Sequence, residues 1–181
     1  EFFASKQHCF WFQQGPPGAW DRHDHSRLRR CHVMLNAVGE VVDKAVTALK
    51  QLRAGFDVES KVRIMGCSMG AHAALEFTRT FPTRVRSAAV CAGYYDNAKV
   101  EQLANATSAV PMLLQHGRYD RYCPFDTIEK FYKLRLASKR FARGFACDNV
   151  HYTEAWFTDG QQHGPTDEER LEIMQWLLKW P

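Results

Sequence analysis

The feature that most constrains the fold of this chain is the run Gly66-Cys67-Ser68-Met69-Gly70, in which a serine stands between two glycines. The residues before it, 62–65, are typical of a strand, and the residues after it, 71–75, favour a helix. A serine on a tight strand-to-helix turn projects its hydroxyl from the edge of a sheet. Glycines on either side let the strand and the helix approach each other closely. The run therefore predicts a strand, a strained turn with Ser68 as a nucleophile, and a helix.

The rest of the chain alternates between patterns typical of strands and patterns typical of helices. Strands are expected at residues 2–12, 61–65, 85–91, 110–115 and 150–157, and helices at residues 33–54, 71–81, 125–141 and 166–179. Thr166 and Glu169 form a capping-box pattern at the start of the last helix. The alternation predicts an α/β fold with a mainly parallel sheet and helices on both faces. The length of 181 residues fits a single domain over residues 1–181.

An activated serine needs a positioned base and an acid that orients the base, and in hydrolases of this architecture the chain order is serine, acid, histidine. Asp120 follows the strand expected at residues 110–115 and so lies on a loop at the carboxyl edge of the sheet. Asp126 is the weaker alternative, because it lies in the first turn of the next helix and suits a helix-dipole role. We therefore expect Asp120 to orient and stabilise the base.

Eight histidines compete for the role of the base. Five of them precede or adjoin Ser68 and break the expected order: His8, His23, His25, His32 and His72. Of the other three, His116 adjoins the acid loop, His151 falls in an expected strand, and His163 lies in a loop before the last helix. We therefore expect His163 to be the general base and then the general acid. The backbone N–H of Met69, at the helix N-terminus, is the expected oxyanion donor.

Other classes of function find little support. The net charge is +4, and the densest basic patch (Arg27, Arg29 and Arg30) is too short for nucleic-acid binding, so we interpret it as a solvated face. His23 and His25 could ligate zinc, but no third ligand is evident, so we expect neither a metal nor an organic cofactor. No apolar run reaches the roughly 18 residues of a membrane span. Six irregularly spaced cysteines favour a reducing, cytoplasmic setting.

These motifs together resemble the α/β-hydrolase superfamily, and within it the phospholipase/carboxylesterase group that includes acyl-protein thioesterases. The resemblance covers nearly the whole chain: Trp11-Phe12 with the helix after it, the segment from Arg63 to Ala71, the segment from Pro111 to Pro124, and His163 with the terminal helix. It implies hydrolysis of a small ester or thioester, or of an acylated protein, through Ser68, Asp120 and His163. Dienelactone hydrolases and prolyl-oligopeptidase-type domains are similar neighbours.

The chain departs from that group at its start. The resemblance implies further strands before Trp11, and a His-Gly loop that donates the second oxyanion N–H, whereas Gln13-Gln14-Gly15 is no clear substitute. We therefore expect an N-terminally shortened fold with half of an oxyanion hole, which costs roughly 100- to 1,000-fold in rate. Two alternatives stay open: a catalytically weak hydrolase-fold protein that acts by binding, and a peptidase of the prolyl-oligopeptidase type.

Overall fold

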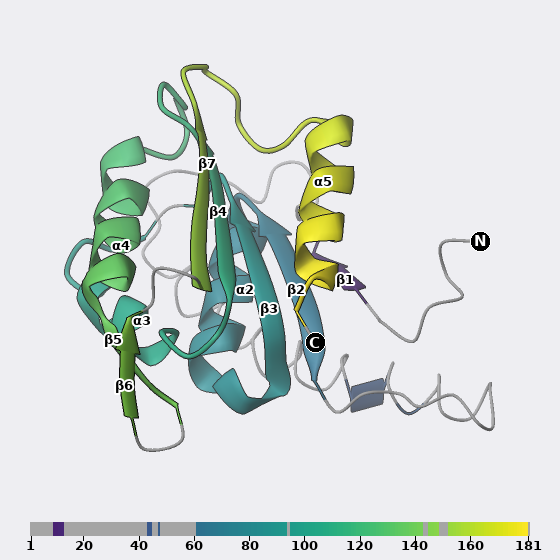
Figure 1. Cartoon of the computed structure of the whole chain (residues 1–181). Helices are drawn as coiled ribbons and strands as arrows, with labels where there is room; N and C mark the ends of the chain where they lie inside the picture. Colours follow the sequence, from purple (N-terminus) through teal and green to yellow (C-terminus); the bar gives the residue numbers. More distant parts are fainter. Residues whose placement is uncertain are drawn as a thin grey trace.

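The computed structural model describes residues 9–12, 43–44, 47, 61–93, 95–142, 145–148 and 152–180. Five strands form one sheet in the order β1-β2-β3-β4-β7 (Figure 1). They are β1 (Cys9–Phe12), β2 (Val62–Cys67), β3 (Val85–Cys91), β4 (Met112–Gly117) and β7 (Thr153–Thr158). All four neighbouring pairs are parallel. The predicted parallel α/β sheet is confirmed.

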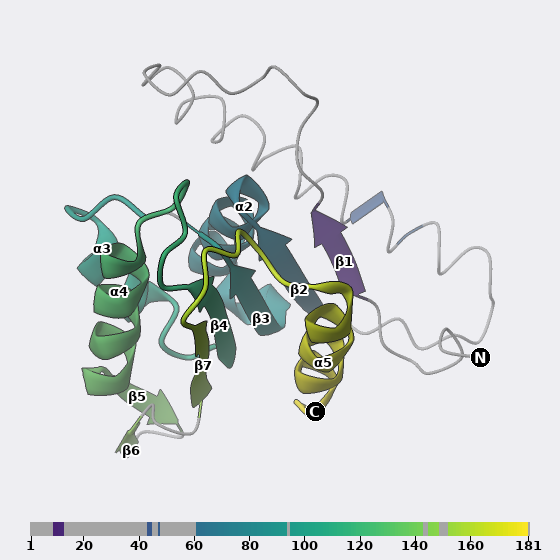
Figure 2. The same cartoon turned by 90° about the horizontal axis from the view of Figure 1, so that it is seen from above.

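Helices cover both faces of this sheet, as the alternation predicted. They are α2 (Met69–Thr80), α3 (Val100–Ala106), α4 (Phe125–Ala137) and α5 (Asp167–Leu178), and a short 3-10 turn spans Pro82–Arg84. Figure 2 shows α5 on the opposite side of the sheet from α2. Within the described part of the chain, no helix combines the length and the apolar character needed to cross a membrane.

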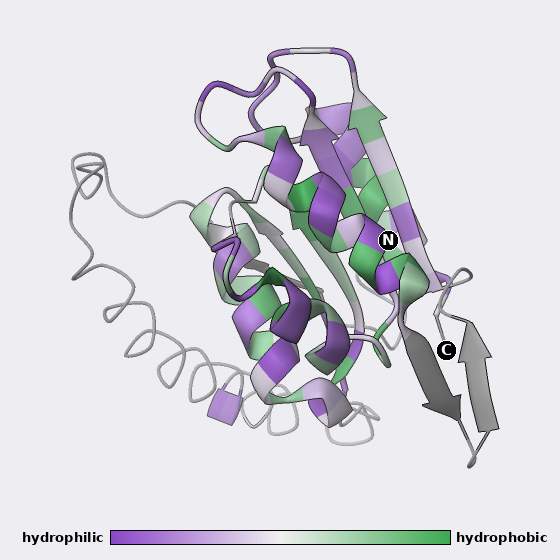
Figure 3. Cartoon of the chain, turned by 90° about the vertical axis from the view of Figure 1, so that its left-hand side faces the viewer, coloured by the Kyte–Doolittle hydropathy of each residue, from purple (hydrophilic) through white to green (hydrophobic). Residues whose placement is uncertain are grey.

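The central strands are apolar on both sides because each side packs against helices. In β4, Met112 and Leu114 belong to the cluster shared with α2, α3 and α4, whereas Leu113 between them belongs to the cluster shared with α5. Successive side chains of a strand point to opposite faces, so a strand covered on both faces reads as a continuous apolar run. In Figure 3, hydrophilic and hydrophobic residues intermingle along the helices turned toward the viewer, as expected when only one side of a helix faces the core.

One expected helix ends earlier than predicted, and two other expected elements lie largely outside the described residues. The helix expected at residues 125–141 ends at Ala137, because Ser138 turns to an extended backbone with φ −71° and ψ 140°. The chain then forms an antiparallel pair, β5 (Lys139–Ala142) with β6 (Phe145–Asp148), that the sequence analysis missed, as it missed α3. The helix expected at residues 33–54 and the start of the strand expected at residues 2–12 lie largely outside the described residues.

A buried arginine holds the last helix against the sheet. Arg63 on β2 donates from Nε to the carbonyl of Leu177 at 2.9 Å and from its terminal nitrogen to the carbonyl of Trp180. Ser87 on β3 donates to the same Leu177 carbonyl at 3.0 Å. A positive charge suits the C-terminal end of a helix, whose last carbonyls lack partners within the helix. These contacts fix α5, and with it the loop that carries His163, relative to β2 and β3.

Candidate active site

Ser68 lies on the predicted strained turn between β2 and α2. Its backbone has φ 57° and ψ −119°, a conformation that residues other than glycine rarely adopt. Position 66, two residues before the serine, tolerates no side chain, because a Cβ there would lie 1.9 Å from the carbonyl oxygen of Gly70. The turn is tied to the next strand by a hydrogen bond from the N–H of Ser68 to the carbonyl of Cys91, at 2.9 Å. The serine is therefore held rigidly at the carboxyl edge of the sheet.

Met69 is the first residue of α2, directly after Ser68. The first N–H groups of a helix have no carbonyl partner within the helix. They carry the partial positive charge of the helix dipole, which favours an anion at this end. The Met69 N–H is thus available at the serine turn, where the sequence analysis expected an oxyanion donor.

Asp120 lies on the loop between β4 and α4, with its side chain fully buried. One carboxylate oxygen, Oδ1, accepts hydrogen bonds from the N–H groups of Tyr122 at 2.8 Å and Cys123 at 3.1 Å. The other, Oδ2, accepts from Nδ1 of His163 at 2.8 Å. The backbone bonds orient the carboxylate and leave one oxygen for the histidine.

His163 completes a continuous hydrogen-bond chain. Its Nε2 lies 2.9 Å from Oγ of Ser68, while Nδ1 lies 2.8 Å from Asp120. Because an ionised carboxylate only accepts hydrogen bonds, Nδ1 carries the proton and Nε2 is free to accept one from the serine. The side chain of His163 is 21% exposed, so solvent reaches this series of hydrogen bonds at the histidine. The structure thus brings together the three side chains that the sequence analysis selected.

Two glycines bring the histidine loop, which crosses from β7 to α5, close to the serine and to the acid (Figure 1). At Gly117, the end of β4, a Cβ would lie 2.6 Å from the carbonyl oxygen of Gln162. At Gly164, which has φ 93°, a Cβ would lie 2.5 Å from Sγ of Cys67. The loop is also tied to α5, because Gln162 donates from its side chain to the Glu169 carboxylate of the predicted capping box.

His116 does not act on the serine, in agreement with its assignment to the acid loop. It is fully buried, and its Nε2 donates to the carbonyl of Cys123 at 2.9 Å. Its Nε2 also lies 3.8 Å from the Asp120 carboxylate, but burial lowers the pKa of His116, so we treat the ring as neutral and not as an ionic partner. Its role is to tie β4 to the loop that wraps the carboxylate.

Side chains that the sequence analysis did not select also surround the site. The ring of Tyr122 lies 5.0 Å from the ring of His163, between centroids, and 66% of the tyrosine is exposed. Sγ of Cys123, an oxygen of Asp120 and a ring nitrogen of His163 all lie within 4.8 Å of one another. Burial, with a smaller contribution from Asp120, raises the pKa of Cys123 to about 12. The sequence offered one sign of the approach of Cys123 to the site, its position three residues after Asp120, because His163 is distant along the chain.

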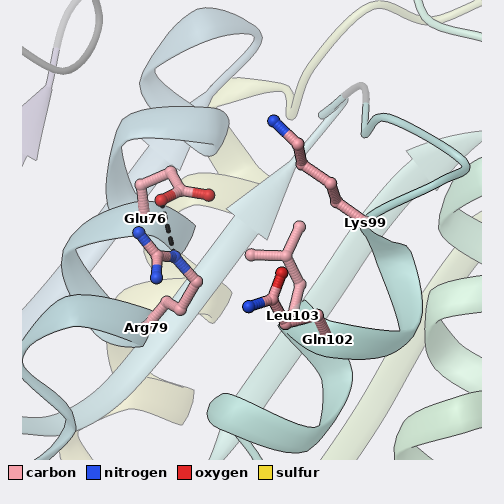
Figure 4. A pocket seen from close by; sticks show the side chains of 5 residues that line it. All are labelled: Glu76, Arg79, Lys99, Gln102 and Leu103. Atoms are coloured by element: carbon pink, nitrogen blue, oxygen red, sulfur yellow. Dashed lines mark hydrogen bonds and ion pairs between the residues drawn. The ribbon is translucent and has the colours of Figure 1, made fainter.

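A separate hollow of about 140 Å³ lies between α2 and α3, and Glu76, Arg79, Lys99, Gln102 and Leu103 line it (Figure 4). Nε of Arg79 is paired with the carboxylate of Glu76 at 2.7 Å. The hollow contains none of the three hydrogen-bonded residues, so it lies apart from the candidate active site. The histidines at positions 23 and 25, and the basic patch at positions 27–30, lie outside the described residues.

Comparison with solved structures supports the fold. Esterase PE8 has a TM-score of 0.58 at 18% identity, over 89% of this chain and 68% of that one. SOBER1 from Arabidopsis thaliana has a TM-score of 0.54 at 19% identity, over 82% and 63%. Acyl-protein thioesterase 2 from Zea mays has a TM-score of 0.51 at 19% identity, over 77% and 64%.

The chain is shorter than several proteins that it resembles. It spans 37% of a thermostable esterase and 63% of SOBER1. A comparison with curated proteins gave no match. The family model of phospholipases and carboxylesterases matches residues 11–153, which is most of the chain and includes both Ser68 and Asp120. On this match and this fold, the chain belongs to the phospholipase/carboxylesterase family of the α/β-hydrolase superfamily.

Proposed function

We propose that this chain is a serine hydrolase that cleaves carboxylic ester or thioester bonds through an acyl-enzyme. The observation that carries the proposal is the unbroken hydrogen-bond chain from Ser68 through His163 to Asp120. A serine hydroxyl is a weak nucleophile alone, and a base at 2.9 Å is within reach of its proton. Family membership supports an esterase or thioesterase chemistry over other reactions.

The first half of the reaction forms the acyl-enzyme. Nε2 of His163 takes the proton of Ser68 as Oγ attacks the carbonyl carbon of the substrate. The Met69 N–H stabilises the developing oxyanion, and the buried Asp120 carboxylate stabilises the imidazolium. When the tetrahedral intermediate collapses, the bond to the leaving group breaks and His163 returns its proton to the departing alcohol or thiol.

The second half uses the same residues with water in place of the serine. Nε2 of His163 takes a proton from a water molecule, and the resulting hydroxide attacks the acyl carbon. The bond to Oγ then breaks, the proton returns to Ser68, and the carboxylic acid leaves. Every proton in this cycle moves between the substrate, water and these two side chains. The substrate is a small ester or thioester, or an acylated protein side chain.

Two further expectations belong to this proposal. We propose one α/β-hydrolase domain over residues 1–181, because α5 near the end packs on the same sheet as the family-matched residues. We also propose a cytoplasmic setting, which agrees with the free thiols of Cys67, Cys91 and Cys123.

The test is labelling with a fluorophosphonate probe, which reacts with an activated serine. The unmutated protein is expected to label, and Ser68→Ala to abolish labelling, while Ser108→Ala, in the loop after α3, is the matched control and labels normally. Ester turnover is expected to fall by roughly 10³-fold or more in His163→Ala and by about 10⁴-fold in Asp120→Asn. Absence of labelling in the unmutated protein favours the binding-protein alternative, and labelling that survives Ser68→Ala refutes the site.

A substrate panel separates esterase from peptidase. p-Nitrophenyl esters of increasing acyl length are compared with aminoacyl p-nitroanilides, so that both series release a chromophore. Turnover of the esters but not of the anilides is expected, because the family match supports esterase or thioesterase chemistry and an amide is a less reactive acyl donor than an ester. Preferential turnover of the anilides would overturn the ester assignment in favour of the peptidase alternative.

A further inference from the structure

Three chemically different ligand atoms lie close together in the candidate active site, on the side of His163 that faces Asp120. They are the thiol sulfur of Cys123, a carboxylate oxygen of Asp120 and a ring nitrogen of His163, all within 4.8 Å of one another. The thiol belongs to the loop that carries the acid: Cys123 is 7% exposed, and its N–H donates to Oδ1 of Asp120 at 3.1 Å. The chemistry proposed above uses the carboxylate and the imidazole but leaves the thiol without a role.

Sulfur, nitrogen and oxygen donors in this combination are the ligands that Zn²⁺ prefers in proteins. Tetrahedral zinc with ligand distances of about 2.0–2.3 Å separates its ligand atoms by about 3.3–3.8 Å. Nδ1 of His163 and Oδ2 of Asp120 lie 2.8 Å apart and the thiol lies within 4.8 Å of both residues' ligand atoms, so the imidazole must move away from the carboxylate by about 0.5–1 Å and the thiol must move in by up to about 1 Å to reach that spacing. Three protein ligands and one open position are typical of zinc sites that exchange water or ligands. The exposed edge of His163 offers the way in.

We propose that Cys123, Asp120 and His163 form a binding site for a thiophilic divalent metal ion, Zn²⁺ above all, and that the bound ion switches off the base of Ser68. The ion takes the place of the proton that Nδ1 of His163 shares with the Asp120 carboxylate, so binding breaks this hydrogen bond. The binding part stands on the ligand geometry alone. The inhibitory part rests on the proposed hydrolase function.

The proton balance explains why a bound ion would inhibit. The Cys123 thiol loses its proton to solvent and binds as a thiolate, with no change in the oxidation state of sulfur or metal. A neutral imidazole that binds a metal through Nδ1 must carry its single proton on Nε2. That proton now faces Oγ of Ser68, so Nε2 can no longer accept the serine proton. The serine stays a neutral, unactivated hydroxyl until the ion leaves.

Binding is tested with Co²⁺, which replaces Zn²⁺ and gives a near-ultraviolet charge-transfer band only when a thiolate is a ligand. The titration is made on the full chain with Ser68→Ala, so that it does not depend on hydrolysis. The band is expected in this protein, absent after the further change Cys123→Ala, and retained after Cys67→Ala, the matched control beside the serine. A band that survives Cys123→Ala, or that is lost in the Cys67 variant alone, overturns the assignment.

Inhibition is tested on the otherwise unmutated protein with Zn²⁺ and a p-nitrophenyl ester. Zn²⁺ is expected to stop turnover, and EDTA to restore it. Cys123→Ala is expected to raise the Zn²⁺ concentration for half-inhibition by roughly 100-fold, because losing a ligand costs at least as much affinity as losing a residue that supports one. Cys123→Ser, which keeps the size of the side chain, gives the same comparison if the alanine variant fails to fold.

The two assays together distinguish failure of the metal site from failure of the inhibitory role and of the proposed hydrolase function. A Cys123-dependent Co²⁺ band in a protein that hydrolyses nothing supports the metal site and overturns the hydrolase function. Turnover that Zn²⁺ does not inhibit, together with a Cys123-dependent band, overturns the inhibitory role. Turnover with no Cys123-dependent band overturns the metal site while leaving the hydrolase intact.

Discussion

The contact between Gly164 and Cys67 joins the histidine loop to the serine turn, and it makes a quantitative prediction. Gly164 has φ 93°, and a Cβ there would lie 2.5 Å from Sγ of Cys67. The backbone strain of a non-glycine residue costs about 1–3 kcal/mol. The overpacking costs about 1–3 kcal/mol more. Gly164→Ala is therefore expected to lower the free energy of unfolding by about 2–6 kcal/mol.

A second substitution separates the two costs. Cys67→Ala removes the sulfur that the new methyl group would meet, but it leaves the backbone strain in place. The double variant is therefore expected to be more stable than the sum of the single changes implies, by about 1–3 kcal/mol. Gly160→Ala is the matched control in the same loop, because a Cβ there would lie 3.8 Å from its nearest neighbours and its backbone is not in the left-handed region. It should change stability by less than about 0.5 kcal/mol.

The assay is urea unfolding of the four Gly164 and Cys67 combinations and of the control, followed by tryptophan fluorescence. Stability is compared through the midpoint at unchanged slope, so that differences reflect the folded state. Strict additivity of the two changes would show that the sulfur contact carries no energy. A Gly164→Ala protein as stable as Gly160→Ala would refute both the strain and the contact.

Two more predictions concern the anchor of α5 and the rim of the site. Arg63→Leu removes the donors to the carbonyls of Leu177 and Trp180 and is expected to lower the free energy of unfolding by about 2–5 kcal/mol. The control, Arg79→Leu, breaks a part-exposed ion pair and is expected to cost less than about 1 kcal/mol. Urea unfolding measures both variants, and equal losses would refute the anchoring role of Arg63. Tyr122→Ser is expected to lower kcat/KM about tenfold for benzyl esters relative to methyl esters of the same acid, because its ring adjoins His163, the residue proposed to protonate the leaving group. Tyr119→Ser, equally exposed, should leave that ratio unchanged, and an equal effect of both variants would contradict the reasoning.

The local parts of the fold were predictable from the sequence, because each depends on neighbouring residues. The glycines around Ser68 indicated the turn from β2 to α2, and Thr166 with Glu169 marked the start of α5, where the capping box is present. The short helix α3 and the β5–β6 pair were missed. The helix α3 has only seven residues, too few to show a helical periodicity in the sequence. The polar residues after Ala137 continue the helical pattern of α4 in the sequence, although the backbone becomes extended at Ser138.

The candidate site was predictable in its members but not in its surroundings. The glycine-flanked turn selected Ser68, and chain order together with expected loop positions selected Asp120 and His163. The structure brings these side chains within hydrogen-bond distance. The contact of Gly164 with Cys67 and the approach of Cys123 to His163 join segments that are distant in sequence. No local pattern records such contacts, since they depend on how β4, β7 and α5 pack.

The wholly parallel pairing of the five strands has a consequence for how the molecule forms. Parallel neighbours need a crossover between them, so none of these pairs can begin as a local hairpin. Along the chain, α4 and the β5–β6 pair separate β4 from β7, so the pairing of these two strands is not local. Each pairing closes a long loop before any contact compensates for the lost chain entropy, which makes folding slow. The reactivity proposed for Ser68 therefore belongs to the completed sheet, and no partly folded intermediate that lacks β7 can have it.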